Sequence, residues 1–170
     1  MIVRNKIWEE LKQADANVRC ICWYTNRQRK WARYYKLFIA VVASVGTFGY
    51  VFTEVLPFAS SLIIAIVSLI KSIFPQILQP ERELCELDDL MEFYNKYFVE
   101  MEILFHQIDK GIDEDEILKE LHDKKIPECE KQSVLNKLIH NISRKKQKEF
   151  IEEADKYVKK VYLNDYEESK

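Results

Sequence analysis

Glycine and proline are scarce in this sequence. Only three glycines and four prolines occur among 170 residues, and long stretches contain neither. These two residues mark the turns of β-rich folds, so their scarcity argues against β structure. The abundant residues, Leu, Ile, Glu and Lys, form helices or are tolerated in them. The composition therefore predicts an all-α chain.

Catalytic motifs are also missing. The sequence contains no glycine-rich phosphate loop, no HExxH, no nucleophile elbow and no CxxC. The three histidines lie far apart, with no Cys or His at ligand spacing, so no metal site is expected. The four cysteines are interpreted as free thiols of a reducing compartment. We therefore expect no enzymatic activity and no cofactor.

Charge is distributed unevenly along the chain. Residues 1–36 hold nine Lys or Arg against three Asp or Glu. Residues 37–80 hold one acidic and one basic residue, and residues 81–170 hold sixteen basic against twenty-four acidic residues. A basic beginning, an almost uncharged middle and an acidic remainder are not typical of one compact soluble domain.

The middle of the chain is apolar enough to enter a membrane. Residues 37–53 carry no charge, a turn is predicted from Glu54 to Pro57, and an apolar run resumes after it. A helix of that first length rises about 25 Å, close to the roughly 30 Å of a hydrocarbon core. The sequence predicts a membrane protein with a two-helix transmembrane hairpin over residues 37–78. Its two spans are expected at about 35–53 and 57–75.

Arginine, lysine and aromatic residues alternate just before this hairpin, from Trp23 to Lys36. Such alternation also occurs in proteins that stack on single-stranded nucleic acid. Here an apolar run follows at once, and Trp, Tyr, Lys and Arg collect at the cytoplasmic membrane interface. We therefore interpret residues 1–36 as an amphipathic, basic and aromatic helix in the cytoplasm. The excess of positive charge before the hairpin predicts that both termini are cytoplasmic.

Small and hydroxyl side chains recur on one face of each predicted span. They let helices pack closely, and in an assembly of several hairpins they can also line a water path. Both interpretations stay open. The candidate pore-lining residues are Ser44, Thr47, Val51, Ser61 and Ser68.

A cytoplasmic helical domain is predicted over residues 81–163, followed by a polar tail over 164–170. Its clearest signal is an apolar stripe with alternating steps of three and four residues, a heptad pattern. The apolar face is too wide for a two-stranded seam, which favours a bundle or a homo-oligomer, with a tetramer as the leading hypothesis. The predicted oligomer seam consists of Leu84, Leu87, Met91, Tyr94, Phe98, Met101, Phe105 and Ile108.

The boundaries of the later helices also carry signals. Gly111 is expected to end the heptad helix and Asp113 to cap the next one. Pro127 is expected near the start of a single final helix, whose apolar stripe is interrupted by a basic cluster. This cluster is either a solvated helix face or a site for an anionic ligand such as nucleotide phosphates. Its members are Arg144, Lys145, Lys146 and Lys148.

Four stretches together carry a resemblance to a known family. They are Trp23-Tyr24 with Arg27, Arg33-Tyr34-Tyr35, Leu90-Met91-Glu92-Phe93-Tyr94 with Tyr97, and Ala154-Asp155-Lys156-Tyr157. With the hairpin they resemble the SLATT family, the two-transmembrane domains associated with bacterial nucleotidyltransferases (SMODS) and SLOG sensor proteins. The resemblance covers most of the chain, and none of its motifs is catalytic.

The resemblance implies a membrane effector of bacterial anti-phage defence in the inner membrane. It implies an oligomeric pore or ion channel that permeabilises the bilayer when triggered, as in abortive infection. The trigger would be a partner nucleotidyltransferase or its nucleotide or oligonucleotide product. The alternative is a membrane-anchored helical interaction module without conduction. The small and polar faces of the spans favour the pore, whereas the heptad stripe fits both.

Overall fold

The computed structural model describes residues 2–48, 65–74, 78–140 and 142–168, and every element within these ranges is a helix. The helices are α1 (Ile2–Phe48), a helix over residues 65–74, α3 (Glu81–Asp109), α4 (Glu114–Leu138) and α5 (Arg144–Glu168). The prediction of an all-α chain is confirmed for this part of the protein.

The chain divides into two compact units. Residues 1–24 and 85–170 form the first, which we call the bundle unit, and residues 25–84 form the second, which we call the apolar unit. Helix α1 contributes residues to both units. The predicted segment over residues 1–36 is thus divided after Tyr24, and its first two thirds belong with the C-terminal helices.

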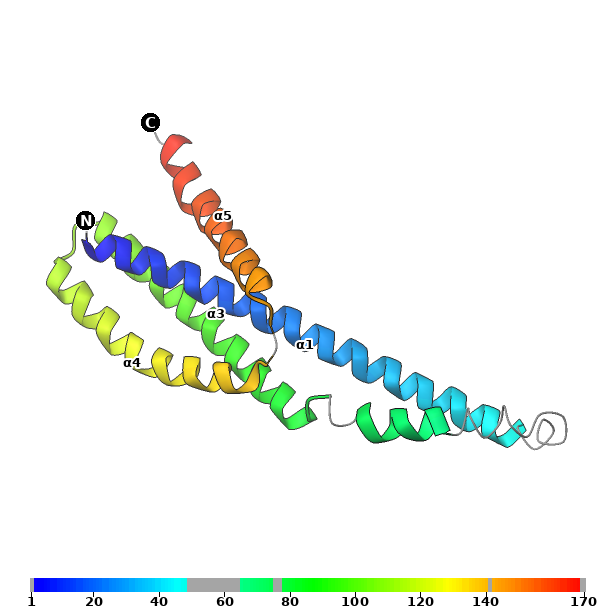
Figure 1. Cartoon of the computed structure of the whole chain (residues 1–170). Helices are drawn as coiled ribbons and strands as arrows, with labels where there is room; N and C mark the ends of the chain where they lie inside the picture. The colour runs from blue at the N-terminus through cyan, green and yellow to red at the C-terminus, as the bar shows by residue number, and fades with distance from the viewer. Residues whose placement is uncertain (1, 49–64, 75–77, 141, 169–170) are drawn as a thin grey trace. The chain divides into compact units, whose positions relative to one another are not determined.

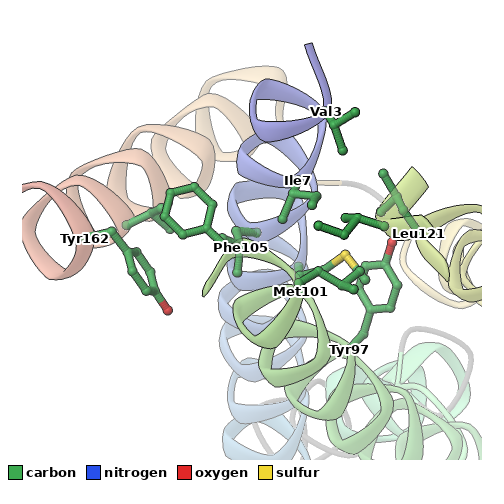
Figure 2. Close-up of a cluster of buried hydrophobic side chains, with 12 residues drawn as sticks. Val3, Ile7, Tyr97, Met101, Phe105, Leu121 and Tyr162 are labelled. Carbon is green, nitrogen blue, oxygen red and sulfur yellow. The ribbon is translucent and has the colours of Figure 1, made fainter. Parts of the chain in front are cut away.

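The core of the bundle unit joins four helices. Ile7, Leu11 and Ala14 of α1 pack among side chains from α3, α4 and α5. Figure 2 shows Phe105 close to Tyr162, and Met101 and Tyr97 close to Leu121. Full burial of each large apolar side chain contributes about 1.5–3 kcal/mol to folding. The members of this core cluster are Val3, Ile7, Leu11, Ala14, Tyr97, Met101, Leu104, Phe105, Ile117, Leu121, Val158 and Tyr162.

The heptad stripe of α3 is part of the chain's own interior. Five of its eight members are buried, namely Leu84, Leu87, Tyr94, Met101 and Phe105. The other three, Met91, Phe98 and Ile108, are partly buried. In Figure 1, α3 runs beside the first part of α1 and beside α4. The stripe assigned to an oligomer seam is therefore covered within a single chain, because a heptad pattern does not distinguish an internal partner from a second copy.

The turn between α3 and α4 follows the sequence signals. Gly111 lies just beyond α3 with φ of +79°, a conformation that glycine adopts at little cost. Its N–H donates to the carbonyl of Ile108 at 3.0 Å. Asp113 caps α4, where its Oδ1 accepts from the Asp115 N–H at 3.5 Å. These two boundary predictions are confirmed.

The prediction of one final helix was wrong. Helix α4 continues through Pro127 and ends at Leu138, and the chain turns at Ile139, which is extended with φ −93° and ψ 104°. A new helix, α5, then begins at Arg144, and the Ser143 Oγ accepts from the Lys146 N–H at 3.3 Å. The apolar residues on either side of the basic cluster therefore belong to different helices, which explains the interruption of the stripe.

In the apolar unit, aromatic rings connect the two helical segments. Phe74 stacks on Tyr35 with centroids 4.9 Å apart and lies 6.1 Å from the ring of Trp31. Among the described residues of this unit, several large apolar side chains are exposed, namely Leu37, Val41, Ile66, Leu69 and Ile73. Among the described residues, no helix has both the length and the apolar character needed to cross a membrane. The predicted spans overlap residues 49–64 and 75–77, which are outside the described part.

The candidate pore residues are only partly covered. Ser44 and Thr47 fall within α1, where the structure describes only their backbone. Ser68 is an exposed residue of the helix over 65–74. Val51 and Ser61 lie outside the described residues. The structure therefore describes the side-chain environment of Ser68 alone among the five.

Candidate functional site

A cavity of about 250 Å³ lies within the bundle unit, between α1, α4 and the beginning of α5. Its walls combine apolar side chains with five carboxamides, and no Asp, Glu, Lys or Arg takes part in the lining. The lining residues are Gln13, Ala16, Asn17, Cys20, Gln132, Leu135, Asn136, Ile139, Ile142, Gln147, Phe150 and Ile151.

Four of the carboxamides form one hydrogen-bonded chain. Gln13 Nε2 donates to Asn17 Oδ1 at 3.1 Å, and Asn17 Nδ2 donates to Gln132 Oε1 at 2.8 Å. Gln132 Nε2 then donates to Asn136 Oδ1 at 3.4 Å. The hydroxyl of Tyr94 also donates to Gln132 Oε1, at 2.9 Å. This chain connects α1 with α4 and holds the polar side of the cavity in a defined arrangement.

The same spacing produces this polar wall on both helices. Gln13 precedes Asn17 by four residues on α1, and Gln132 precedes Asn136 by four residues on α4. Residues four apart lie on one face of a helix, so each Gln reaches its own Asn. An apolar residue precedes each Asn and lines the cavity beside it: Ala16 precedes Asn17 on α1, and Leu135 precedes Asn136 on α4.

The burial of this region changes the acidity of its titratable groups. Burial raises the pKa of the Cys20 thiol to about 11, which leaves it protonated and unreactive at neutral pH. Burial, followed by the nearby Glu128 carboxylate, raises the pKa of the Tyr94 hydroxyl. Tyr94 therefore remains a hydrogen-bond donor to Gln132 across the physiological range.

Polar side chains also hold α4 against α1 and α3 next to the core. Lys125 Nζ donates to Glu10 Oε1, and the Tyr97 hydroxyl donates to Glu10 Oε2 at 3.1 Å. Glu128 is buried beside them. Burial, and then the nearby Glu10 carboxylate, raises the pKa of Glu128, while Lys125 opposes the shift. This cluster fixes the position of α4, on which Gln132 and Asn136 stand.

The basic cluster predicted from the sequence forms the first turn of α5. Lys146 packs against the cavity wall, with its ammonium 5.0 Å from the ring centroid of Phe150 and 5.8 Å from that of Trp23. Its Nζ also donates to Glu149 Oε1 at 2.5 Å. Arg144, Lys145 and Lys148 are exposed. The structure thus places one of the four predicted ligand residues against the cavity wall.

The sequence did not reveal the carboxamides as a site. The available signal was the repeated Gln-x₃-Asn spacing, at residues 13 and 17 and at residues 132 and 136. Asn17 and Gln132, one residue from each pair, are 115 residues apart in the sequence, and only the fold brings them together. Within the described part of the chain, no group of three His, Cys, Asp or Glu side chains is placed to hold a metal ion.

The bundle unit is therefore an all-helical domain with a neutral, carboxamide-lined cavity and a basic helix start beside it. Comparison of the chain with protein-family models, with curated proteins and with solved structures finds no match.

Proposed function

We propose that this protein is a membrane effector of bacterial anti-phage defence, anchored in the inner membrane by a hairpin over residues 37–78 with both termini in the cytoplasm. In this proposal several hairpins assemble into a pore or ion channel, because one hairpin cannot enclose a water path. A tetramer is the simplest arrangement, and its contacts involve surfaces other than the buried stripe of α3. A nucleotide or oligonucleotide from a partner nucleotidyltransferase is the proposed trigger.

One observation carries the proposal: several large apolar side chains in the described part of the apolar unit are exposed. Leu37 and Leu69 are 63% and 61% exposed. Ile66, Leu69 and Ile73 follow steps of three and four residues, so they share one helix face. A contiguous exposed apolar face favours contact with a membrane or a partner. The adjacent basic and aromatic residues from Trp31 to Lys36 favour the membrane, since these residue types concentrate at its interface.

The second candidate function is a membrane-anchored interaction module that conducts nothing. The bundle unit supports it, because its four-helix core and its cavity are sufficient for binding without any pore. Both candidates predict the same localisation and the same topology. Conduction is the property that separates them.

A flux assay tests the proposal. The purified full-length chain is reconstituted into liposomes that contain a self-quenched dye, and dye release is followed after addition of candidate nucleotides. A pore predicts release from liposomes that contain the protein and a change in rate for Ser68→Leu. Ser133→Leu, an exposed serine of α4, is the matched control and is expected to behave like wild type. Intact liposomes under all conditions would favour the interaction module.

A further inference from the structure

The cavity presents hydrogen-bond donors and acceptors side by side. Each carboxamide carries two N–H donors and one acceptor oxygen. The bonds between Gln13, Asn17, Gln132 and Asn136 use only part of this capacity and orient the remaining groups. Gln147 adds a fifth carboxamide from α5. Such a wall recognises a planar ligand whose edge alternates donors and acceptors.

Size and charge restrict this ligand further. Pockets for drug-sized molecules occupy about 300–1,000 Å³, so a cavity of about 250 Å³ accepts one ring system rather than a whole dinucleotide. None of the lining residues is charged, and an ionised group inside would be poorly compensated. The part of the ligand inside the cavity must therefore be small and neutral.

A nucleobase satisfies these conditions. Asn and Gln side chains pair in a bidentate manner with base edges, as they do with adenine in nucleic acids. Aromatic side chains stack on exposed bases. Phe150 supplies an aromatic ring in the cavity wall, next to Ile151. The combination of carboxamides and one aromatic wall is thus the chemistry of base recognition.

The beginning of α5 offers a place for the rest of a nucleotide. Gln147 lines the cavity, and the residues on either side of it, Lys146 and Lys148, are basic. The first turn of α5 contains no acidic residue, and Lys146 already bonds Glu149, so Arg144 and Lys145 are the positive side chains that stand at the positive end of the helix dipole. Like charges repel each other there, and a bound phosphate would offset this repulsion. The phosphate would remain outside the uncharged cavity.

We infer that the cavity binds the base of a nucleoside phosphate and that the first turn of α5 binds its phosphate. The inference rests on the proposed function in one respect, since it describes the chemistry of the proposed trigger. The base would contact α1, α4 and α5 together, so that the ligand joins three helices of the bundle unit. A ligand that prefers this joined arrangement shifts the protein towards it.

Calorimetric titration of the full-length chain in detergent tests the inference. The probes are AMP, GMP, CMP and UMP, with ribose 5-phosphate as the probe that lacks a base. At least one nucleotide is expected to bind tenfold or more tightly than ribose 5-phosphate. Equal affinity for ribose 5-phosphate, or no binding of any of the four nucleotides at millimolar concentration, would overturn the inference.

Variants at the rim locate the binding. Asn136 and Gln147 are exposed residues of helices, so Asn136→Leu and Gln147→Leu leave the core intact, and each should weaken nucleotide binding at least tenfold. Asn95→Leu, at an exposed position of α3 away from the cavity, is the matched control. Lys145→Glu with Lys148→Glu should weaken binding of the nucleotide but not of the nucleoside. Unchanged affinity in the Asn136 and Gln147 variants would contradict the assignment of the cavity.

Cys20 provides a second readout, because it lines the cavity whereas Cys22, Cys85 and Cys129 are exposed. With these three replaced by Ser, alkylation at pH 9 reports on Cys20, and a bound nucleotide should slow it. The flux assay on the same preparation separates the two proposals. Nucleotide binding without dye release supports this inference and opposes the pore, whereas dye release without any nucleotide binding supports the pore and overturns this inference.

Discussion

The two units use the same apolar residue types in opposite ways. In the bundle unit, Ile7, Leu11 and Val158 are fully buried among helices of the same chain. In the apolar unit, Leu37 and Leu69 are more than 60% exposed. Water favours the first arrangement and disfavours the second. The contrast indicates that these apolar side chains of the bundle unit are covered by their own chain, whereas those of the apolar unit remain available for contact with a partner or a membrane.

The largest expected effect comes from charge in the buried stripe. Leu87→Asp with Met101→Asp places two carboxylates at positions of 0% exposure, and we expect a loss of at least about 4 kcal/mol and failure of the bundle unit to fold. Val99→Asp with Ile103→Asp, on the same helix but 50% and 51% exposed, should change stability by about 0.5 kcal/mol or less. Thermal melting followed by circular dichroism compares the two variants.

This experiment also decides between an internal core and an oligomer seam. If the Leu87 and Met101 variant melts like wild type but changes its oligomer size, the stripe faces a second copy and the core assignment fails. If it loses its helical signal at low temperature while the Val99 and Ile103 variant keeps it, the stripe is internal.

The second prediction concerns the solvent of the apolar unit. Ile66→Lys with Leu69→Lys introduces two charges on one exposed face, at a cost of about 2.5–3.5 kcal/mol for each Lys near the centre of a membrane span. We expect the variant to leave the membrane fraction after carbonate extraction. Ile103→Lys with Ile126→Lys, at positions of 51% and 55% exposure in the bundle unit, is the matched control and should stay with the membrane. Retention of both variants in the membrane would contradict the proposed anchor.

The sequence predicted local features better than distant ones. The apolar steps of α3, the glycine after it and the Asp113 cap depend on neighbouring residues, and all three are present in the structure. The stripe of α3 was predicted to contact other copies, whereas in the structure it packs against helices of the same chain. A heptad repeat shows which helix face is apolar but not what covers that face. The break between α4 and α5 was not predicted, since both helices carry apolar residues at helical spacing. Because proline is common at helix starts, Pro127 led to a predicted boundary that falls inside α4.

The cavity was beyond reach of sequence patterns for a related reason. Asn17 and Gln132 contact each other across 115 residues, and polar residues on helix faces are most often solvated. By contrast, the basic cluster at the start of α5 was visible as a local excess of charge. The structure adds that Lys146 of this cluster rests on Phe150, which is part of the cavity wall.

The third prediction is a pH dependence confined to the bundle unit. Burial raises the pKa of Glu128 above its ordinary value of 4.5, so the folded state binds a proton more readily than the unfolded state. Stability therefore falls as pH rises from 4.5 through the raised pKa, and the loss remains above it. Glu128→Gln should be more stable than wild type at pH 7 and equal to it at pH 4.

Denaturant unfolding at both pH values measures this difference. Glu130→Gln, at an exposed position of the same helix, is the control, and its free energy of unfolding should not increase at either pH. A Glu128→Gln variant that is destabilised equally at both pH values would mean that the carboxylate is held by favourable contacts rather than penalised by burial.

The smallest expected effect lies in the apolar unit, at the ring contacts of Phe74. Phe74→Ala removes its stacking on Tyr35 and its contact with Trp31, each worth about 0.5–1.5 kcal/mol. Since these rings belong to residues 25–84, the melting of the bundle unit should not change. The fluorescence of Trp31, isolated by Trp8→Phe and Trp23→Phe, should report a more solvated ring.

Phe93→Ala, which removes ring contacts with Tyr94 and Tyr97, should give the reverse result, with a lower melting temperature and unchanged Trp31 emission. If Phe74→Ala lowers the melting temperature of the bundle unit as much as Phe93→Ala does, the two units are not independent in stability. The contrast between them would then be one of solvent exposure alone, because their folding would be a single cooperative event.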